Sequence, residues 1–255
     1  RVPPHETENG DEVGHAVFGM VSSAMPSLEL RRVEFVGPQV GDELRDQFKY
    51  AATRIESTEL VRAGVVRTGP QPTAVTAYQT GSHCLIKGKM QERQGADGQP
   101  YAIGFEMRLP KEWNGRFFYQ ANGGLDGVVQ PALGALGGGP LTGALAQGFA
   151  VISSDAGHNP RQNPYFGSEP QARQDYGYTA VGKLTPMAKE TIKRAYGKGP
   201  DRSYFAGCSN GGRDALMLAQ RHPGDYDAIV AGAPANDFTG LMVSFAHIGR
   251  LARTT

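Results

Sequence analysis

From residue 149 onward, short apolar segments alternate with segments of helical periodicity, and this alternation constrains the fold more than any other feature. Residues 149–153 (FAVIS) form an apolar run of strand length, typical of a strand buried on both faces. The segments that follow are predicted as helix, strand, helix and strand, at Leu184–Tyr196, Ser203–Ala206, Gly211–Arg221 and Ala228–Ala231. Because helical crossovers join parallel strands, this order predicts an α/β fold with a mostly parallel sheet.

The first of these helices is the clearest. Its apolar residues recur at helical spacing, Thr185-Pro186 suits a helix start, and Gly197 suits its end. A further helical stretch is predicted at Leu241–Leu251.

Shorter strand-like segments precede residue 149. They lie at Ile55–Leu60, Cys84–Met90, Ala102–Leu109 and Arg116–Gln120, and Thr142–Gln147 is a short helix candidate. Residues 1–50 carry no chemical motif, although residues 41–50 have a helix-like pattern. We therefore expect a segment of unclear role at 1–50 and part of one α/β domain at 51–255.

Charge and hydropathy exclude two classes of partner. The 26 basic and 25 acidic residues leave a net charge of +1 with no long basic run, so nucleic acid has no electrostatic footprint. No run approaches the ~20 apolar residues that a membrane-spanning helix needs. We expect neither nucleic acid nor a membrane as a partner.

The strongest chemical motif is Gly207-Cys208-Ser209-Asn210-Gly211, which fits G-x-S-x-G. A nucleophile between a strand and a helix lies on a sharp, strained turn, and flanking glycines allow close backbone packing there. The motif follows a predicted strand and precedes a predicted helix, which is the context it requires. Ser209 is therefore the candidate nucleophile.

A second glycine-rich loop, Asn122-Gly123-Gly124, follows the strand Arg116–Gln120. Serine hydrolases of this architecture take a second oxyanion donor from such a loop. Because Asn-Gly is also a strong turn signal, a plain turn remains the alternative.

Two histidines stand in recognisable patterns. Asp155 and His158 follow a predicted core strand, and we interpret them as shaping a loop beside the site rather than as a catalytic pair or a metal site. His222 suits a helix C-terminus, where a cation is favoured by the helix dipole. No metal-binding residues are predicted in this chain.

Several dispersed motifs together resemble the tannase/feruloyl esterase family. The resemblance extends from about Arg54 to the C-terminus and is carried by Tyr204–Arg213, Ala219–Pro223, Ala231–Ala235, Leu109–Phe117, Asn122–Gly124 and Asp155–His158. It implies an α/β-hydrolase-type fold with a lid inserted late in the sheet. It also implies a Ser-Asp-His triad in that chain order, with Ser209 as the nucleophile and the N–H groups of Asn210 and Gly124 as the oxyanion hole.

The resemblance further implies that the chain is incomplete. Only 46 residues follow Ser209, whereas the acid and base would need at least two further strand–helix units of about 30 residues each. We therefore expect these residues to be the N-terminal half of a longer enzyme. The lid and the last strands would lie in a missing C-terminal half or a second chain. No cofactor is expected here, although the family's lid holds a structural calcium.

The resemblance assigns both cysteines to disulfides. Cys208 would pair with a cysteine after the catalytic His, and Cys84 with one near the N-terminus, but neither partner is present. A Cys84–Cys208 bond is the alternative. Disulfides indicate a secreted or periplasmic location.

The leading interpretation is a carboxylic-ester hydrolase that acts on small esters of aromatic acids, such as feruloyl, galloyl or terephthaloyl esters. Two alternatives stay open. The chain could be a non-catalytic fragment that keeps the nucleophile without a base, or a serine hydrolase of another substrate class, such as a peptidase.

Overall fold

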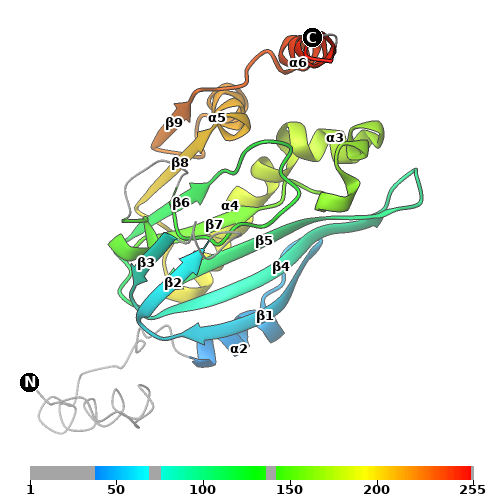
Figure 1. The fold of residues 1–255 in the computed structure, drawn as a ribbon. Helices are drawn as coiled ribbons and strands as arrows, with labels where there is room; N and C mark the ends of the chain where they lie inside the picture. Colours follow the sequence, from blue (N-terminus) through cyan, green and yellow to red (C-terminus); the bar gives the residue numbers. More distant parts are fainter. Residues whose placement is uncertain (1–37, 69–75, 136–141, 254–255) are drawn as a thin grey trace, which may run out of the picture.

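A mixed seven-stranded sheet organises the chain (Figure 1). The structure is a computed structural model that describes residues 38–68, 76–135 and 142–253. Across the sheet the strands lie in the order β1 (Thr53–Val61), β4 (His83–Gln94), β5 (Pro100–Pro110), β7 (Ala150–Ser154), β6 (Arg116–Gln120), β8 (Arg202–Cys208) and β9 (Ala228–Gly232). A separate two-stranded sheet pairs β2 (Gly64–Thr68) with β3 (Thr76–Thr80).

The sheet changes from antiparallel to parallel pairing at β7. Strands β1, β4, β5 and β7 pair antiparallel, and a tight turn joins β4 to β5, with Gly95 N–H donating to the Gln99 carbonyl at 2.8 Å. Strands β7, β6, β8 and β9 pair parallel, and α4 (Ala180–Tyr196) and α5 (Asn210–Arg221) connect the last three sequential strands of this set. The predicted α/β fold is confirmed, and its parallel part contains the G-x-S-x-G turn.

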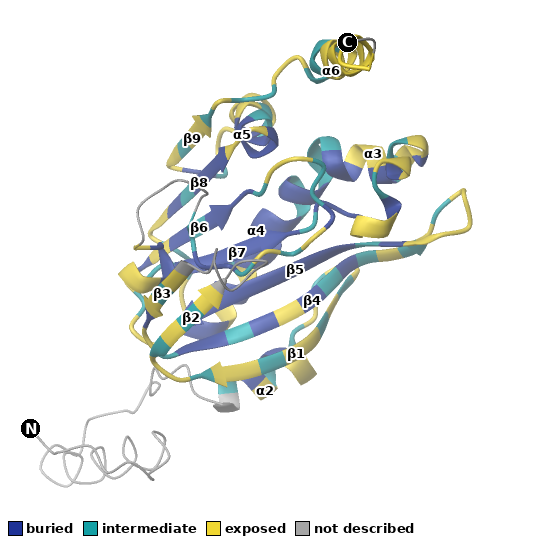
Figure 2. Ribbon diagram, viewed as in Figure 1, coloured by how far each residue is buried: buried dark blue, intermediate teal, exposed yellow. Residues whose placement is uncertain are grey.

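The main core lies between the sheet and α4 (Figure 2). Phe117, Ile152 and Phe205 from the parallel strands pack in it together with Leu184 and Ile192 of α4, and all are fully buried. Helix α2 (Pro38–Gln47) contributes to the same core through Leu44, so the helix-like pattern within residues 41–50 forms part of the packed fold. Residues 1–37 lie outside the described residues, and the division at residue 50 stays a prediction.

Two helix starts were predicted too late, and one predicted helix is a 3-10 turn. The helix expected from Leu241 begins at Phe238. The helix expected from Leu184 already begins at Ala180, so Pro186 lies inside it. Buried Ala180 and Val181 extend the helix toward the N-terminus because their packing outweighs the cost of the proline. Preceding it are α3 (Pro170–Gln174) and the π-helical turn η5 (Asp175–Thr179). The candidate at Thr142–Gln147 is only the 3-10 turn η2 (Leu145–Gln147).

The remaining short elements are η3 (Pro160–Gln162) and η4 (Tyr165–Ser168), which lie between β7 and α3. None of the helices within the described ranges is long and apolar enough to cross a membrane.

The side of the sheet at β9 is the least covered part of the fold (Figure 2). Val230 on β9 is 60% exposed. Helix α6 (Phe238–Leu251) follows. It has no buried residue, although it is rich in apolar side chains. Val243, Phe245 and Ile248 are its most exposed large apolar side chains. An apolar helix and an edge strand therefore face solvent together.

Stability should depend on the core and not on the exposed side chains of α6. Ile152→Ala should lower the free energy of unfolding by about 2–5 kcal/mol, because it leaves a cavity in the core between the sheet and α4. Phe245→Ser should change it by less than about 0.5 kcal/mol, because this side chain is 57% exposed. Urea unfolding followed by circular dichroism measures both, and equal losses would contradict the described packing.

Candidate active site

Ser209 lies at the elbow between β8 and α5. Its backbone has φ 59° and ψ −116°, outside the regions that residues with a side chain favour, and the residue is exposed. Such a conformation costs on the order of 1–3 kcal/mol and persists only where the surroundings impose it. The expected strained strand-to-helix turn is therefore present at Ser209.

The glycines of the motif are required by close backbone packing. A Cβ atom on Gly207 would collide with the backbone of Gly211, and one on Gly211 would collide with the carbonyl oxygen of Asn122. The elbow thus presses against itself and against the loop after β6. A larger residue at Gly207 would push β8 and α5 apart, and one at Gly211 would push the loop and the elbow apart.

The Asn122–Gly124 loop lies beside Ser209, as the sequence analysis required. A Cβ atom placed on Gly123 would be 3.8 Å from the Cβ of Ser209 and 3.4 Å from the carbonyl oxygen of Cys208. Gly124 has a φ of 67°, and a Cβ there would meet nothing within 4 Å. Gly123 is thus the glycine closer to the elbow, whereas Gly124 was the donor favoured from the sequence.

Three backbone N–H groups are available at this point. Asn210 is the first residue of α5, where N–H groups have no partner within the helix. Within the described ranges, the N–H groups of Gly123, Gly124 and Asn210 donate to no other group of the protein. A helix N-terminus with free N–H groups stabilises negative charge. The assignment of Asn210 and Gly124 as oxyanion donors stays a prediction.

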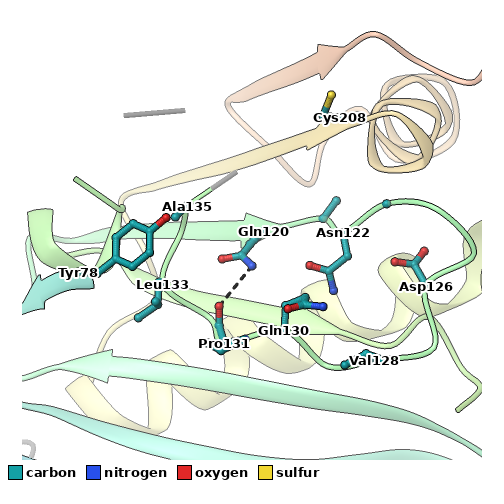
Figure 3. A pocket seen from close by; sticks show the side chains of 12 residues that line it. Tyr78, Gln120, Asn122, Asp126, Val128, Gln130, Pro131, Leu133, Ala135 and Cys208 are labelled. Carbon is teal, nitrogen blue, oxygen red and sulfur yellow. Dashed lines mark hydrogen bonds between the residues drawn. The ribbon is translucent and has the colours of Figure 1, made fainter. Parts of the chain in front are cut away.

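A cavity of about 540 Å³ opens next to the elbow (Figure 3). Cys208 lines it at the end of β8, and Asn122, Gly123 and Asp126 line it from the loop after β6. Tyr78 and Leu133 add apolar surface. This volume accommodates a small organic molecule.

The sequence analysis did not identify Asp126, which is one of the most perturbed groups at the site. Its carboxyl oxygen Oδ2 accepts a hydrogen bond of 2.8 Å from the Asn210 side-chain amide. Burial, and after it the nearby Asp214, raise the pKa of Asp126 to about 8. Burial likewise raises the pKa of Asp214 to about 7. An isolated aspartate after a Gly-Gly turn carries no signal in the sequence that would separate it from a surface residue.

Asp155 and His158 support the loop after β6, in agreement with the interpretation as loop-shaping residues. Asp155 accepts hydrogen bonds of 2.9 Å from the N–H groups of Gly104 and Gly157. His158 Nε2 donates to the Leu125 carbonyl at 2.8 Å, and its ring stacks on Phe166 with centroids 3.7 Å apart. Burial lowers the pKa of His158, so the ring is neutral near pH 7.

In the described part of the chain, no histidine hydrogen-bonds Ser209. His222 ends α5, 3.9 Å from Asp225, and His247 lies exposed on α6. His83 lies on β4, with its Nδ1 2.8 Å from the Gly81 carbonyl. The described residues also contain no group of three or more His, Cys, Asp or Glu side chains suited to a metal ion.

Both cysteines are free, and the alternative Cys84–Cys208 disulfide was wrong. Four strand intervals of about 4.8 Å separate β4 from β8, whereas a disulfide needs Cα atoms within about 7 Å. Burial raises the pKa of the Cys84 thiol to about 11, and Cys208 is exposed next to Ser209. Pairing of either cysteine with one outside these residues stays a prediction.

Comparison with known proteins agrees with this geometry. Residues 86–255 match the family described as tannase and feruloyl esterase. The chain belongs to this family. It is 44% identical to mono(2-hydroxyethyl) terephthalate hydrolase from Piscinibacter sakaiensis over 171 residues. This alignment covers 64% of this chain and 28% of the relative. A probable feruloyl esterase B from Emericella nidulans is 38% identical over 145 residues, 57% of this chain and 26% of the relative.

Two solved structures share the fold. An esterase from Aspergillus oryzae superposes with a TM-score of 0.67 and 27% identity, over 82% of this chain and 40% of that one. Feruloyl esterase B from the same organism superposes with a TM-score of 0.63 and 27% identity, over 77% and 37% of the two chains. With 28% and 26% of the two curated relatives covered, the chain spans about a quarter of their length.

The raised pKa of Asp126 predicts a pH-dependent stability. The folded state keeps this carboxyl protonated up to about pH 8, whereas the unfolded chain ionises it above about pH 4, so its contribution to stability falls as the pH rises between these values. Asp126→Asn should remove that contribution. From pH 5 to 8, the unfolding free energy of the wild type should therefore fall relative to that of the variant, by up to about 1 kcal/mol per pH unit.

Urea unfolding at pH 5 and pH 8 measures this shift. Asp97→Asn serves as the control, because a hydrogen bond from the Gln99 N–H lowers the pKa of Asp97, which is therefore ionised throughout the range. A pH-independent difference for Asp126→Asn would contradict the raised pKa.

Proposed function

We propose that this chain contributes the nucleophile and the oxyanion hole of a serine carboxylic-ester hydrolase. The observation that carries the proposal is the strained elbow at Ser209, held against the Gly123–Gly124 loop. The chain's membership in a family described as tannase and feruloyl esterase supports the same chemistry.

In the proposed reaction, Ser209 Oγ attacks the carbonyl carbon of the ester while its proton passes to a histidine base. The carbonyl oxygen becomes an oxyanion, which accepts hydrogen bonds from the N–H of Asn210 and from a glycine N–H of the loop. Collapse of this intermediate expels the alcohol, which takes the proton from the base, and leaves an acyl-enzyme on Ser209. Water then releases the acid by the reverse proton path.

Esters of aromatic acids are the proposed substrates. The named relatives support this class, since one is a terephthalate ester hydrolase and another a probable feruloyl esterase. The cavity beside Cys208 has room for one aromatic ring and contains Tyr78 and Leu133 as apolar lining.

The proposed catalytic base comes from a portion of the protein outside these 255 residues, on the same or a second chain. Two observations support this. The chain covers 28% and 26% of the two relatives named above, and no histidine among the described residues hydrogen-bonds Ser209. The exposed β9 edge and the apolar face of α6 are the surfaces that such a portion would cover.

Removal of the nucleophile tests this function. In the protein that includes the additional portion, Ser209→Ala should lower hydrolysis of a nitrophenyl ester of an aromatic acid by at least about 10³-fold. The 255-residue chain alone should be inactive, because it lacks a base. Stopped assays at pH 7 with matched ester and amide substrates measure both effects.

Full activity of the Ser209→Ala protein would contradict the proposal, as would faster cleavage of the amide than of the ester. High esterase activity of the 255-residue chain alone would instead place the base within it, and His158→Ala and His247→Ala would then identify it.

We further propose that Cys208 forms a disulfide with a cysteine of the additional portion, in an oxidising compartment outside the cytoplasm. The exposed thiol next to Ser209 supports this, since such a bond would tether the elbow to the loop that carries the base. Non-reducing peptide mapping of the complete protein should find Cys208 oxidised, and Cys208→Ala should cost about 2–5 kcal/mol of stability. A Cys208 thiol that is freely alkylated under native oxidising conditions would contradict it.

A further inference from the structure

We propose that Asp126, Arg213 and Tyr176 are positioning residues, which lock the Gly123–Gly124 loop and the first turn of α5 together so that both sets of free N–H groups face one point. This inference rests on the proposed esterase function. It is carried by a closed ring of hydrogen bonds that joins three segments distant in sequence: the loop after β6, the π-helical turn η5 and helix α5.

The ring begins at the Asn210 side chain, directly after the nucleophile. Its Nδ2 donates to Asp126 Oδ2 at 2.8 Å, and its Oδ1 accepts from Arg213 Nε at 2.7 Å. Asn210 is 1% exposed, so both bonds are shielded from water. The Asn210 side chain is thus held from two directions. Its backbone N–H is one of the proposed oxyanion donors, so these bonds also hold the residue that carries the donor.

Arg213 connects this side chain to η5. Its Nη1 donates to the Gly177 carbonyl at 2.8 Å and its Nη2 to the Tyr176 carbonyl at 2.9 Å. The guanidinium also lies 5.0 Å from the centre of the Tyr176 ring and pairs with Asp214 at 2.8 Å. A planar group with several donors in fixed directions fits this arrangement, and lysine could not replace it.

Tyr176 closes the ring at the loop. Its hydroxyl donates to the Gly124 carbonyl at 2.8 Å, and the Asp126 N–H donates to the Gly123 carbonyl at 3.2 Å. A trans peptide is planar, so its N–H points opposite to its carbonyl. Fixing the Gly123 carbonyl therefore aims the Gly124 N–H, and fixing the Gly124 carbonyl holds the next peptide plane.

The loop is also held from outside the ring. The Leu125 carbonyl accepts from His158 at 2.8 Å, and the Asp126 carbonyl accepts from Asn163 Nδ2 at 3.2 Å. Three consecutive carbonyls of the loop are thus bound by side chains. What the ring adds is a link to α5, which carries the other proposed donor.

The ring should matter for the transition state more than for substrate binding, because an oxyanion hole stabilises charge that develops during the reaction. Opening the ring leaves each N–H in place but frees the loop to move relative to α5. Since displacements of about 1 Å can cost up to about 10²-fold in rate, we expect a loss of about 10-fold.

The test compares two Tyr→Phe variants in the complete protein. Tyr176→Phe removes the hydroxyl that binds the Gly124 carbonyl. Tyr196→Phe is the matched control, because its hydroxyl donates to the Pro110 carbonyl at 2.6 Å, away from the site, and both tyrosines are 7% exposed. Tyr176→Phe should lower kcat about 10-fold with KM within about 2-fold. Tyr196→Phe should leave both within about 2-fold.

Phenylboronic acid provides a second readout, because it forms a tetrahedral adduct with an active serine and mimics the intermediate. Its binding should weaken by the same factor as kcat in Tyr176→Phe and stay unchanged in Tyr196→Phe. Asn210→Ala, which keeps the backbone N–H, should also lower kcat. The double variant with Tyr176→Phe should lose less than the product of the two single losses, since one cut already opens the ring.

The outcomes separate the two proposals. A wild-type protein that neither hydrolyses aromatic esters nor binds the boronic acid overturns the proposed function, and this inference with it. An active wild type in which Tyr176→Phe matches Tyr196→Phe in kcat and boronic acid binding overturns the positioning role alone, as do multiplicative losses in the double variant.

Discussion

The close approach of three backbone segments at Gly207, Gly211 and Asn122 is the constraint on which the rest of the site depends. Side chains at the two glycine positions would collide with neighbouring backbone. Their absence lets β8 turn directly into α5 and lets the loop after β6 lie against the turn. Ser209 is held in its strained conformation by this packing. The hydrogen bonds of Asn210, Arg213 and Tyr176 then fasten two of these segments, the loop after β6 and α5, to each other and to η5.

The parallel half of the fold could be predicted because its signals are local. Apolar runs at Phe149–Ser153 and Ala228–Ala231, together with the periodicity of α5, fix strand and helix types within a few residues. The glycine pattern around Ser209 also carries its own steric reason. The start of α4 was mispredicted because Thr185-Pro186 is a strong local signal for a helix start, whereas tertiary packing of Ala180 and Val181 decides the boundary.

The ring around Asn210 could not have been predicted. Its members come from residues 124–126, 176–177 and 210–213, which the fold brings together only after β6, η5 and α5 are in place. An aspartate, a tyrosine and an arginine are common residues, and nothing in their spacing links them. Which of Gly123 and Gly124 lies closer to the elbow could not be predicted for the same reason. Both follow Asn122, and only the packing against Cys208 and Ser209 distinguishes them.

The central claim is that the elbow and the glycine loop converge on one oxyanion site. A crystal structure of the complete protein after reaction with an aryl phosphonate ester tests it most directly. The account predicts a phosphorus–oxygen bond to Ser209 Oγ, with the phosphoryl oxygen about 3 Å from the N–H of Asn210 and from that of Gly123 or Gly124. Labelling of another residue, or a phosphoryl oxygen that points away from both N–H groups, would contradict it.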